Sequence, residues 1–342
     1  MKTYFTLFLV ACQSVWALGQ NDKTPYMTKS LAADAIRSVV VSTSAGGIQV
    51  SGESGQAPRI EVYIQDNHGH ELSKGEIEKR LNDDYDMSIT VNNHELQAIV
   101  KNRHMNMRWS ESMSISFKIY VPEQVNTDLK TSGGGIELDH LKGNENFSTS
   151  GGGLEMSYLT GTIHGRTSGG GIQVSNSGDD IDLSTSGGGI TAADCKGKIR
   201  LMTSGGGIQL RNLKGEITAH TSGGGVEAGN IEGELETGSS GGSIDLRDMN
   251  CSLSANTSGG SLRAQIKQVG KFLKLGTSSG NIDLELPARQ GLDLDLYGES
   301  VNSHEFNGFK GTFDERHVKG SVNGGGAEVD AHASGNINVT FN

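Results

Sequence analysis

The chain has 342 residues, of which 50 are glycine and only 4 are proline, and aromatic residues make up 5%. So much glycine with so few aromatic residues is unusual for a compact globular domain and favours a repetitive architecture. The formal net charge of -11 argues against nucleic acid or anionic lipid as a partner, because binding either one requires a basic surface.

Residues 1–19 have the features of a cleaved signal peptide. Lys2 precedes the apolar stretch YFTLFLVA, and the small residues Ala17 and Gly19 lie before a polar turn. A second interpretation stays open, because LVAC, ending at Cys12, resembles the lipobox of bacterial lipoproteins and would make Cys12 the site of a lipid anchor. Both interpretations predict an extracytoplasmic protein, in the periplasm, in the cell envelope or at the cell surface.

Residues 20–130 are predicted to form an N-terminal cap that contains a first repeat and an insertion. The repeat is SVVVSTSAGGIQV, and the insertion holds a capping-box pattern in which Ser73 precedes Glu76. This pattern predicts one short helix within HELSKGEIEKRLNDD. The alternating segments MSITV, LQAIV and MSISFKIYV predict strands, the last of which ends at Pro122.

Residues 131–286 repeat with a period of eighteen, and we call each repeat a rung. Each rung opens with Thr-Ser-Gly-Gly-Gly or a close variant, and a ninth opens at Thr277 after a two-residue insertion. A fixed period of this length is typical of a solenoid, in which neighbouring repeats stack. The eight regular rungs begin at Thr131, Thr149, Thr167, Thr185, Thr203, Thr221, Ser239 and Thr257.

Apolar residues occupy fixed positions within each rung, counted from its first residue. Positions five and seven alternate with polar residues, as do positions fourteen and sixteen, so each rung is predicted to contain two short strands. One rung cannot fold alone, because four or five buried aliphatic residues contribute about 1.5 to 3 kcal/mol each, against about 1 to 2 kcal/mol per ordered residue. The predicted fold is an all-β, right- or left-handed β-solenoid of 18-residue rungs with irregular caps and one short helix.

The three glycines mark a sharp bend between rungs. We attribute them to positive φ angles at the bend and to close approach of stacked backbones. The Thr-Ser pair before them is expected to form a ladder of hydroxyl groups along the edge. A phosphate-binding loop is disfavoured because no helix follows the glycines.

Residues 287–342 are predicted to form a C-terminal cap. LDLDLYG, NGGGAEV and SGNINVTF are irregular echoes of the rung. Atypical terminal repeats of this kind protect the open edges of a solenoid.

The order of these motifs resembles the putative adhesin family of bacterial envelope β-solenoid proteins. The resemblance rests on TSAGGIQV, the YVPEQV that closes the insertion, the TSGGGI rungs, SSGNIDL, NGGGAEV and SGNINV. It implies an extracytoplasmic β-solenoid that serves adhesion or surface interaction, and it supplies no catalytic residues.

The outward position six of the rungs carries the candidate binding residues. Most are acidic or amide side chains, which also suit a solvated outer face. Glu137 and Glu155 are expected to lie one strand spacing apart, where like charges repel, so we hypothesise that a divalent cation, or a cationic or hydroxyl-rich ligand, relieves the repulsion. No cofactor and no metal site are assigned. The candidates are Glu137, Glu155, Gln173, Gln209, Glu227, Asp245 and Asp283.

Three smaller features involve side chains that can bind metals or form disulfides. HMNMRWSESM, which begins at His104, could supply copper ligands, although a polar hairpin loop is the simpler interpretation. HGH, at residues 68–70, is a weaker signal. Cys195 and Cys251 lie three rungs apart, about 14 Å along the axis, which exceeds the limit of about 7 Å for a disulfide and predicts two free thiols.

These observations favour a non-catalytic, extracytoplasmic, adhesin-like or scaffolding protein whose repetitive surface binds a polymer or an envelope protein. The alternative is a polysaccharide-active β-helix enzyme. It is disfavoured because a catalytic cleft on a solenoid comes from long loops between rungs, and the eight regular rungs carry no insertions. An ice- or surface-binding array of threonines is the third possibility, and it fails if the threonines point inward.

Overall fold

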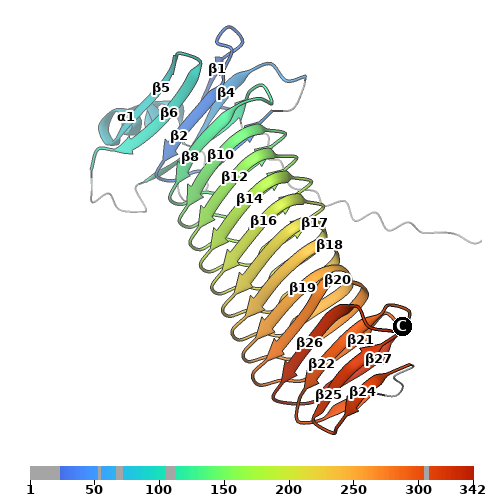
Figure 1. The fold of residues 1–342 in the computed structure, drawn as a ribbon. Helices are drawn as coiled ribbons and strands as arrows, with labels where there is room; N and C mark the ends of the chain where they lie inside the picture. Colours follow the sequence, from blue (N-terminus) through green and yellow to red (C-terminus); the bar gives the residue numbers. More distant parts are fainter. Residues whose placement is uncertain (1–23, 53–54, 67–71, 105–111, 304–307) are drawn as a thin grey trace, which may run out of the picture.

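The computed structural model describes residues 24–52, 55–66, 72–104, 112–303 and 308–342. The predicted signal peptide, Cys12, the HGH segment and residues 105–111 lie outside these ranges. The chain forms a long β-solenoid of about 9 turns with rungs of about 18 residues, and it is 65% β and 4% helix. Figure 1 shows a rod of stacked rungs with an irregular end at each terminus. The all-β solenoid prediction is therefore confirmed.

Two rows of parallel strands run along the rod, and we call them the A row and the B row. Within the regular rungs, paired residues lie eighteen positions apart in the chain, so that Glu155 pairs with Glu137 and Thr167 with Thr149. The A row contains β3 (Ile48–Ser51), β9 (Ile136–Asp139), β11 (Leu154–Ser157), β13 (Ile172–Ser175), β15 (Ile190–Ala193) and β21 (Ile282–Leu286). The B row contains β2 (Ser38–Thr43), β8 (Asn126–Thr131), β10 (Lys142–Thr149), β12 (Thr160–Thr167), β14 (Gly178–Thr185) and β16 (Lys196–Thr203).

In the later rungs a single long strand continues through the bend and belongs to both rows. These long strands are β17 (Ile208–Thr221), β18 (Val226–Ser239), β19 (Ile244–Thr257) and β20 (Leu262–Thr277). Their inward side chains are buried as the alternation predicts, for example Ile208, Leu210 and Ile217. At the bend between the strands, position ten holds a buried apolar side chain such as Leu213.

The structure of the glycine bend shows that one of its two predicted roles, positive φ angles, is wrong. The glycines of the regular rungs adopt no positive φ there; their role is close approach alone. A Cβ on the middle glycine, Gly152, would lie 2.0 Å from the carbonyl oxygen of Gly134. A Cβ on Gly151 would lie 3.4 Å from its nearest neighbouring atom, and one on Gly153 would lie 3.2 Å from its own. The sequence agrees, because the first and third positions accept substitutions such as Ser279 and Ser243 while the middle one stays glycine.

Positive φ angles occur instead at the other bend, at position nine of seven successive rungs. Asn212 is typical, with φ of 54°. Asparagine and aspartate tolerate this left-handed conformation better than most residues, because their short side chains bond locally. The seven residues are His140, Tyr158, Asn176, Asp194, Asn212, Asn230 and Asp248.

The threonines that open the rungs also differ from the prediction. They are buried, and their hydroxyls do not form a ladder with each other. Thr149 Oγ1 instead donates to the carbonyl oxygen of Gly134 at 2.8 Å and accepts from the Gly152 amide at 3.3 Å. Because the threonines point inward, the ice- or surface-binding threonine array is excluded.

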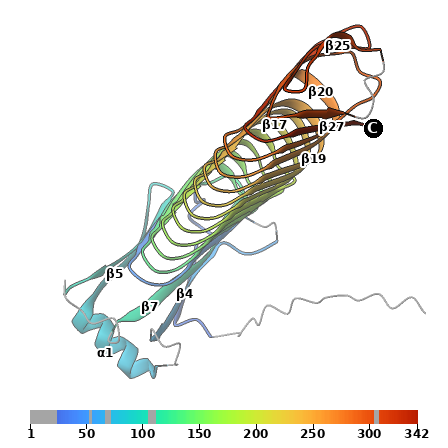
Figure 2. The same cartoon turned by 90° about the horizontal axis from the view of Figure 1, so that it is seen from below.

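The N-terminal cap adds strands beyond the first rung. The insertion between β3 and β8 forms β4, α1, β5, β6 and β7, and the predicted helix and strands are confirmed. Ser73 caps α1, with its side chain accepting a bond from the Glu76 amide at 3.3 Å. The elements are β1 (Met27–Ser30), β4 (Arg59–Asp66), α1 (Lys74–Asp84), β5 (Tyr85–Asn92), β6 (Glu95–Asn102) and β7 (Met113–Tyr120). Figure 2 shows α1 at the N-terminal end of the rod.

Spatial order departs from chain order at both ends. The first rung, β2 and β3, lies between the second rung and the inserted strands β6 and β7. At the other end, the last two strands of the chain, β26 and β27, lie between β20 and β21 on one side and β22 and β23 on the other. The last strands are β22 (Leu292–Tyr297), β23 (Val301–Ser303), β24 (Lys310–Phe313), β25 (His317–Val322), β26 (Ala327–Ala333) and β27 (Ile337–Phe341).

Two further findings concern the interior and the membrane. Cys195 and Cys251 are buried free thiols, which confirms the prediction from the rung register. Within the described residues, no helix combines the length and the apolar character needed to cross a bilayer.

Candidate functional site

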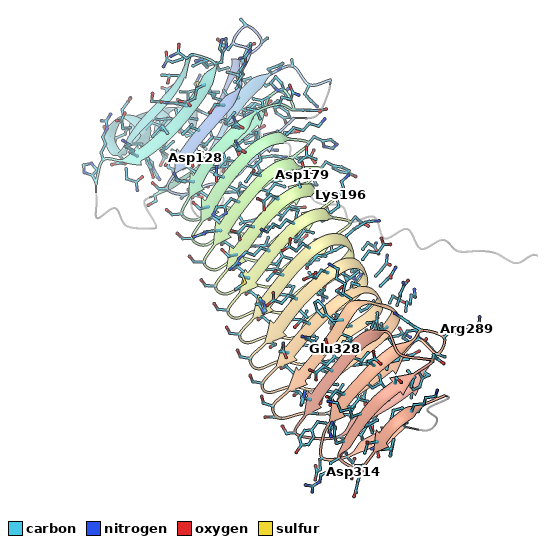
Figure 3. The ribbon with its side chains drawn as sticks, in the orientation of Figure 1. Asp128, Asp179, Lys196, Arg289, Asp314 and Glu328 are labelled. Carbon is cyan, nitrogen blue, oxygen red and sulfur yellow. The ribbon has the colours of Figure 1, made fainter. Side chains whose placement is uncertain are left out.

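The seven predicted binding residues lie in one outward-facing row that crosses the A row of strands. Register pairing joins each side chain to the next. Thr191 and Arg263 lie between the candidates, and Lys118, Gln49 and Asn338 extend the row at its ends. Figure 3 shows outward side chains arranged along the rod. The full order is Lys118, Gln49, Glu137, Glu155, Gln173, Thr191, Gln209, Glu227, Asp245, Arg263, Asp283 and Asn338.

The N-terminal half of this row lines a groove of about 1540 Å³. The floor is formed by β3, β9, β11, β13 and β15, and it presents Glu137, Glu155 and Gln173. Residues of the N-terminal cap line the groove as well, among them Tyr63 and Tyr120. The absence of insertions within the regular rungs therefore did not exclude a cleft, because the insertion that precedes them borders the sheet.

A second groove of about 640 Å³ continues along the same row. Gly189 and Thr191 line both grooves, so the two are contiguous. Gln209, Glu227 and Asp245 line the second. Six of the seven predicted residues thus line the two grooves, and Asp283 lies further along the row.

Glu137 and Glu155 are register partners on β9 and β11. Desolvation in the groove raises the pKa of Glu137 above its ordinary value, and the carboxylates of Glu155 and Asp139 raise it further. The Lys118 cation partly opposes this rise in pKa, and so does the Gln49 amide, which donates to Glu137 Oε1 at 3.1 Å. Among the described residues, Glu155 has no hydrogen bond or ion pair. The strand register thus places the two carboxylates at adjacent positions, as the sequence predicts.

Two other acidic residues of the row, Asp245 and Asp283, have partners. Arg247 donates two hydrogen bonds to Asp245, at 3.0 and 2.8 Å, and this contact lowers the pKa of Asp245. Asn338 donates to Asp283 at 2.9 Å, and Arg263 lies 3.6 Å from the same carboxylate. Among the described residues, Glu137, Glu155 and Glu227 are the acidic residues of the row that have no cation within ion-pair distance.

The cap side of the groove combines aromatic rings with cations. The Arg59 guanidinium lies 3.7 Å from the centre of the Tyr120 ring, and Lys118 Nζ lies 5.4 Å from that of Tyr63. The Tyr63 hydroxyl donates to Glu61 at 2.8 Å, and burial with this carboxylate raises the pKa of Tyr63 to about 12. These contacts fix both rings.

The sequence contains a signal for one further residue of the groove. Gln49 occupies position six of the first repeat, the same position as Glu137, and it was not included among the candidates. Tyr63, Lys118 and Tyr120 carry no such signal. Their positions depend on the pairing of β7 with β3 across a long insertion and, for Tyr63, on the pairing of β4 with β7.

The described residues contain no group of three or more histidine, cysteine, aspartate or glutamate side chains placed to hold a metal ion. The pair on β9 and β11 offers two carboxylates, whereas calcium takes six to eight oxygen ligands. The arrangement suits hydrogen bonding and ion pairing with a ligand better than metal coordination.

Comparison with known proteins gives a family and two solved structures. A family model described as Toastrack DUF4097 matches residues 36–340. A putative adhesin from Bacteroides fragilis NCTC 9343 aligns at 16% identity over 75% of this chain and 95% of its own, with a TM-score of 0.33. A putative cell adhesion protein from Clostridium sporogenes ATCC 15579 aligns at 11% identity over 92% of this chain and 98% of its own, with a TM-score of 0.21. No curated protein matches the chain. Because the family model spans nearly all the rungs and both caps, the chain belongs to the Toastrack DUF4097 family.

Proposed function

We propose that the protein is a non-catalytic, extracytoplasmic, adhesin-like protein that binds a linear, hydroxyl-rich polymer along its grooved face. The observation that carries this proposal is the continuity of the row: two contiguous grooves present one hydrogen-bonding side chain per rung, from Gln49 to Asp245. A polymer of identical units suits a groove floor of identical rungs, because each unit meets a side chain in the same position.

The size and chemistry of the grooves support a polymer. The larger groove exceeds the roughly 300 to 1,000 Å³ of sites that enclose a small molecule, and both grooves run along the rod across successive strands. Gln173, Thr191 and Gln209 offer both donors and acceptors, which is what neighbouring hydroxyl groups require. Strands about 4.8 Å apart set the repeat of these groups.

The extracytoplasmic location rests on residues 1–19. Protease treatment of intact cells, followed by detection of peptides from the rungs, distinguishes the outer surface from the periplasm. Loss of these peptides indicates surface exposure, and their survival indicates a periplasmic protein. Detection of intact protein in the cytoplasmic fraction alone contradicts the proposal.

Sedimentation with insoluble polysaccharides and envelope fractions tests binding directly. We expect at least one linear polymer to sediment the protein and the double variant Gln173→Ala, Gln209→Ala to bind it at least about tenfold more weakly, since each lost hydrogen bond contributes about 1 kcal/mol. Asn146→Ala, an exposed change on the B row, is the matched control. Equal loss in the control, or unchanged binding by the double variant, contradicts a role for the groove.

A second candidate is a polysaccharide hydrolase, which Glu137 and Glu155 favour. Two neighbouring carboxyl groups with one raised pKa are the pattern of an acid and a nucleophile in a retaining glycosidase. Both side chains, however, project from the same face of one sheet, whereas a glycosidase places its carboxyl groups on opposite sides of the scissile bond. Release of reducing ends from a polymer, abolished by Glu137→Gln and by Glu155→Gln, would replace the binding proposal.

A further inference from the structure

We infer that the polymer is a glycan and that the row ends, at the N-terminal cap, in a site where Tyr63 and Tyr120 pack against one of its sugar rings. We call Arg59, Glu61, Tyr63 and Tyr120 the tyrosine site. This inference rests on the proposed function and narrows its ligand from any hydroxyl-rich polymer to one made of sugar rings.

The tyrosine site lies on the same sheet face as the groove floor. β7 and β4 extend the A row beyond β3, because Gln49 pairs with Lys118 and Lys118 pairs with Glu61. Tyr63 lies two residues beyond Glu61 on β4, and Tyr120 lies two residues beyond Lys118 on β7, so both tyrosines project from this face. Since β4 runs antiparallel to β7, these two steps lead to opposite sides of the row. A polymer that follows the row therefore passes between the two tyrosines.

One network of contacts holds both rings in place. The Tyr63 hydroxyl donates to Glu61 Oε2 at 2.8 Å, and Arg59 Nε donates to Glu61 Oε1 at 2.6 Å. The Arg59 guanidinium also lies 3.7 Å from the centre of the Tyr120 ring. The bond to Glu61 turns the Tyr63 ring toward the row, where Lys118 Nζ lies 5.4 Å from the ring centre. Rings that are fixed before binding lose little conformational entropy when a ligand packs on them.

The tyrosine site supplies a chemistry that the groove floor lacks. From Gln49 to Asp245 the outward side chains of the floor are polar, one per rung, and such groups bind hydroxyls of any polymer. A tyrosine ring adds a rigid apolar surface with a polar tip, which matches a sugar with C–H groups on its ring and hydroxyls around it. Tyr63 and Tyr120 are half-buried and line the larger groove, as does Tyr26. Because a few aromatic residues carry most of the binding energy of an interface, we expect binding to be strongest at the cap end of the row.

Calorimetric titration of the full mature chain with three probes tests whether sugar rings are recognised. Two probes are the linear hexamers of glucose and of N-acetylglucosamine. The third is poly(vinyl alcohol) of matched chain length, which is linear and rich in hydroxyl groups but contains no ring. We expect at least one hexamer to bind at least about tenfold more tightly than poly(vinyl alcohol), because only a sugar ring packs against the tyrosines.

Substitutions locate the site with the same hexamer. Tyr63→Ala and Tyr120→Ala should each weaken binding at least about tenfold, as truncation of a central aromatic contact does. Tyr120→Phe keeps the ring and its contact with Arg59, and it should retain binding. Tyr297→Ala is the matched control, because Tyr297 is 51% exposed on β22 and lines neither groove. Melting temperatures of all four variants separate a loss of binding from a loss of folded protein.

The outcomes separate the two proposals. If poly(vinyl alcohol) binds as tightly as the hexamers, hydroxyl groups alone are recognised and this inference is wrong, while the proposed function stands. If neither folded alanine variant weakens binding, if Tyr120→Phe loses it, or if Tyr297→Ala weakens it equally, the tyrosine site is wrong. If only a lysine pentapeptide binds, the partner is a protein and both proposals are wrong. If no probe binds at all, the inference is overturned, and the sedimentation assay alone decides the proposed function.

Discussion

Thr149 Oγ1 donates a hydrogen bond to the carbonyl oxygen of Gly134, fifteen residues earlier, at 2.8 Å. The same bond links each later rung to the one before it, including Thr185 to Gly170 at 2.8 Å and Ser239 to Gly224 at 2.7 Å. The acceptor is always the middle glycine, whose carbonyl is the one that stacked bends bring closest. Threonine and glycine thus form a single structural unit that spans two rungs.

The threonine hydroxyl should contribute to stability through this bond. Thr185→Val keeps the shape of the side chain but leaves the part-buried Gly170 carbonyl without its hydroxyl donor, so we expect a loss of about 1 to 3 kcal/mol in the free energy of unfolding. Thr185→Ser retains the hydroxyl, as the native Ser239 does, and should lose less. Urea unfolding followed by circular dichroism measures both, and a valine variant as stable as the serine variant would contradict the role of the hydroxyl.

The middle glycine should tolerate substitution least. A Cβ on Gly170 would lie 2.0 Å from the Gly152 carbonyl oxygen, whereas a Cβ on Gly169 would lie 3.4 Å from its nearest neighbour. Because the contact at Gly170 involves backbone atoms, the rungs must separate to accept a methyl group. We expect Gly170→Ala to destabilise the protein by more than about 3 kcal/mol and Gly169→Ala by about 1 kcal/mol or less. Thermal unfolding of the two alanine variants measures this difference. Similar melting temperatures for both would show that the bend is not tight.

The rungs could be predicted from the sequence because each one is specified locally. The strand partners of Glu155 and of Ile208 lie eighteen residues before and after them, so the period alone predicts the strands, their register and the buried positions. The role of the middle glycine was only half predicted, since a pattern of small residues does not distinguish positive φ from close approach.

The caps and the groove depend on contacts that carry no periodic signal. β26 lies between β20 and β22, although β22 precedes it in the chain, and β7 pairs with β3 across the insertion. Tyr63 and Tyr120 reach the groove through such pairings. The row of Glu137 and Glu155 could therefore be predicted from the sequence, whereas the cap residues on the other side of the groove could not.

Glu145 should make stability depend on pH. It is fully buried at an inward position of β10, with Thr127 donating to Oε2 at 2.6 Å and no partner for Oε1 among the described residues. Burial raises the pKa of Glu145 from its ordinary 4.5 to about 7. Below about pH 4.5 the carboxyl is neutral in both folded and unfolded chains. Between pH 4.5 and about 7 only the unfolded chain ionises, so stability falls as pH rises, by about 3 kcal/mol in total.

Two variants test this assignment by urea unfolding between pH 4 and pH 8. Glu145→Ile introduces the residue found at the equivalent position of the next rung, Ile163, and should raise stability at pH 8 and flatten the profile. Glu216→Gln, at an exposed site, should leave the profile as in the wild type. A wild-type profile that does not fall between pH 4.5 and 7, or one that Glu145→Ile does not change, would show that Glu145 is hydrated in solution.

Removal of one whole rung tests the modular character of both fold and function. Deletion of residues 185–202 joins Ser184 to Thr203 with every position of the rung preserved, and it brings Gln209 into register with Gln173 in the groove floor. Because a rung contacts its immediate neighbours, both caps and every remaining bond between threonine and glycine are retained. We expect a folded protein with a slightly lower melting temperature and polymer binding that falls in a graded way.

Deletion of nine residues instead places inward side chains opposite outward ones, and it should unfold the rod. Circular dichroism and sedimentation with polymer distinguish the cases. If both deletions unfold the protein equally, neighbouring rungs are not independent; if the eighteen-residue deletion folds but binds nothing, recognition depends on one rung and not on the repeated floor.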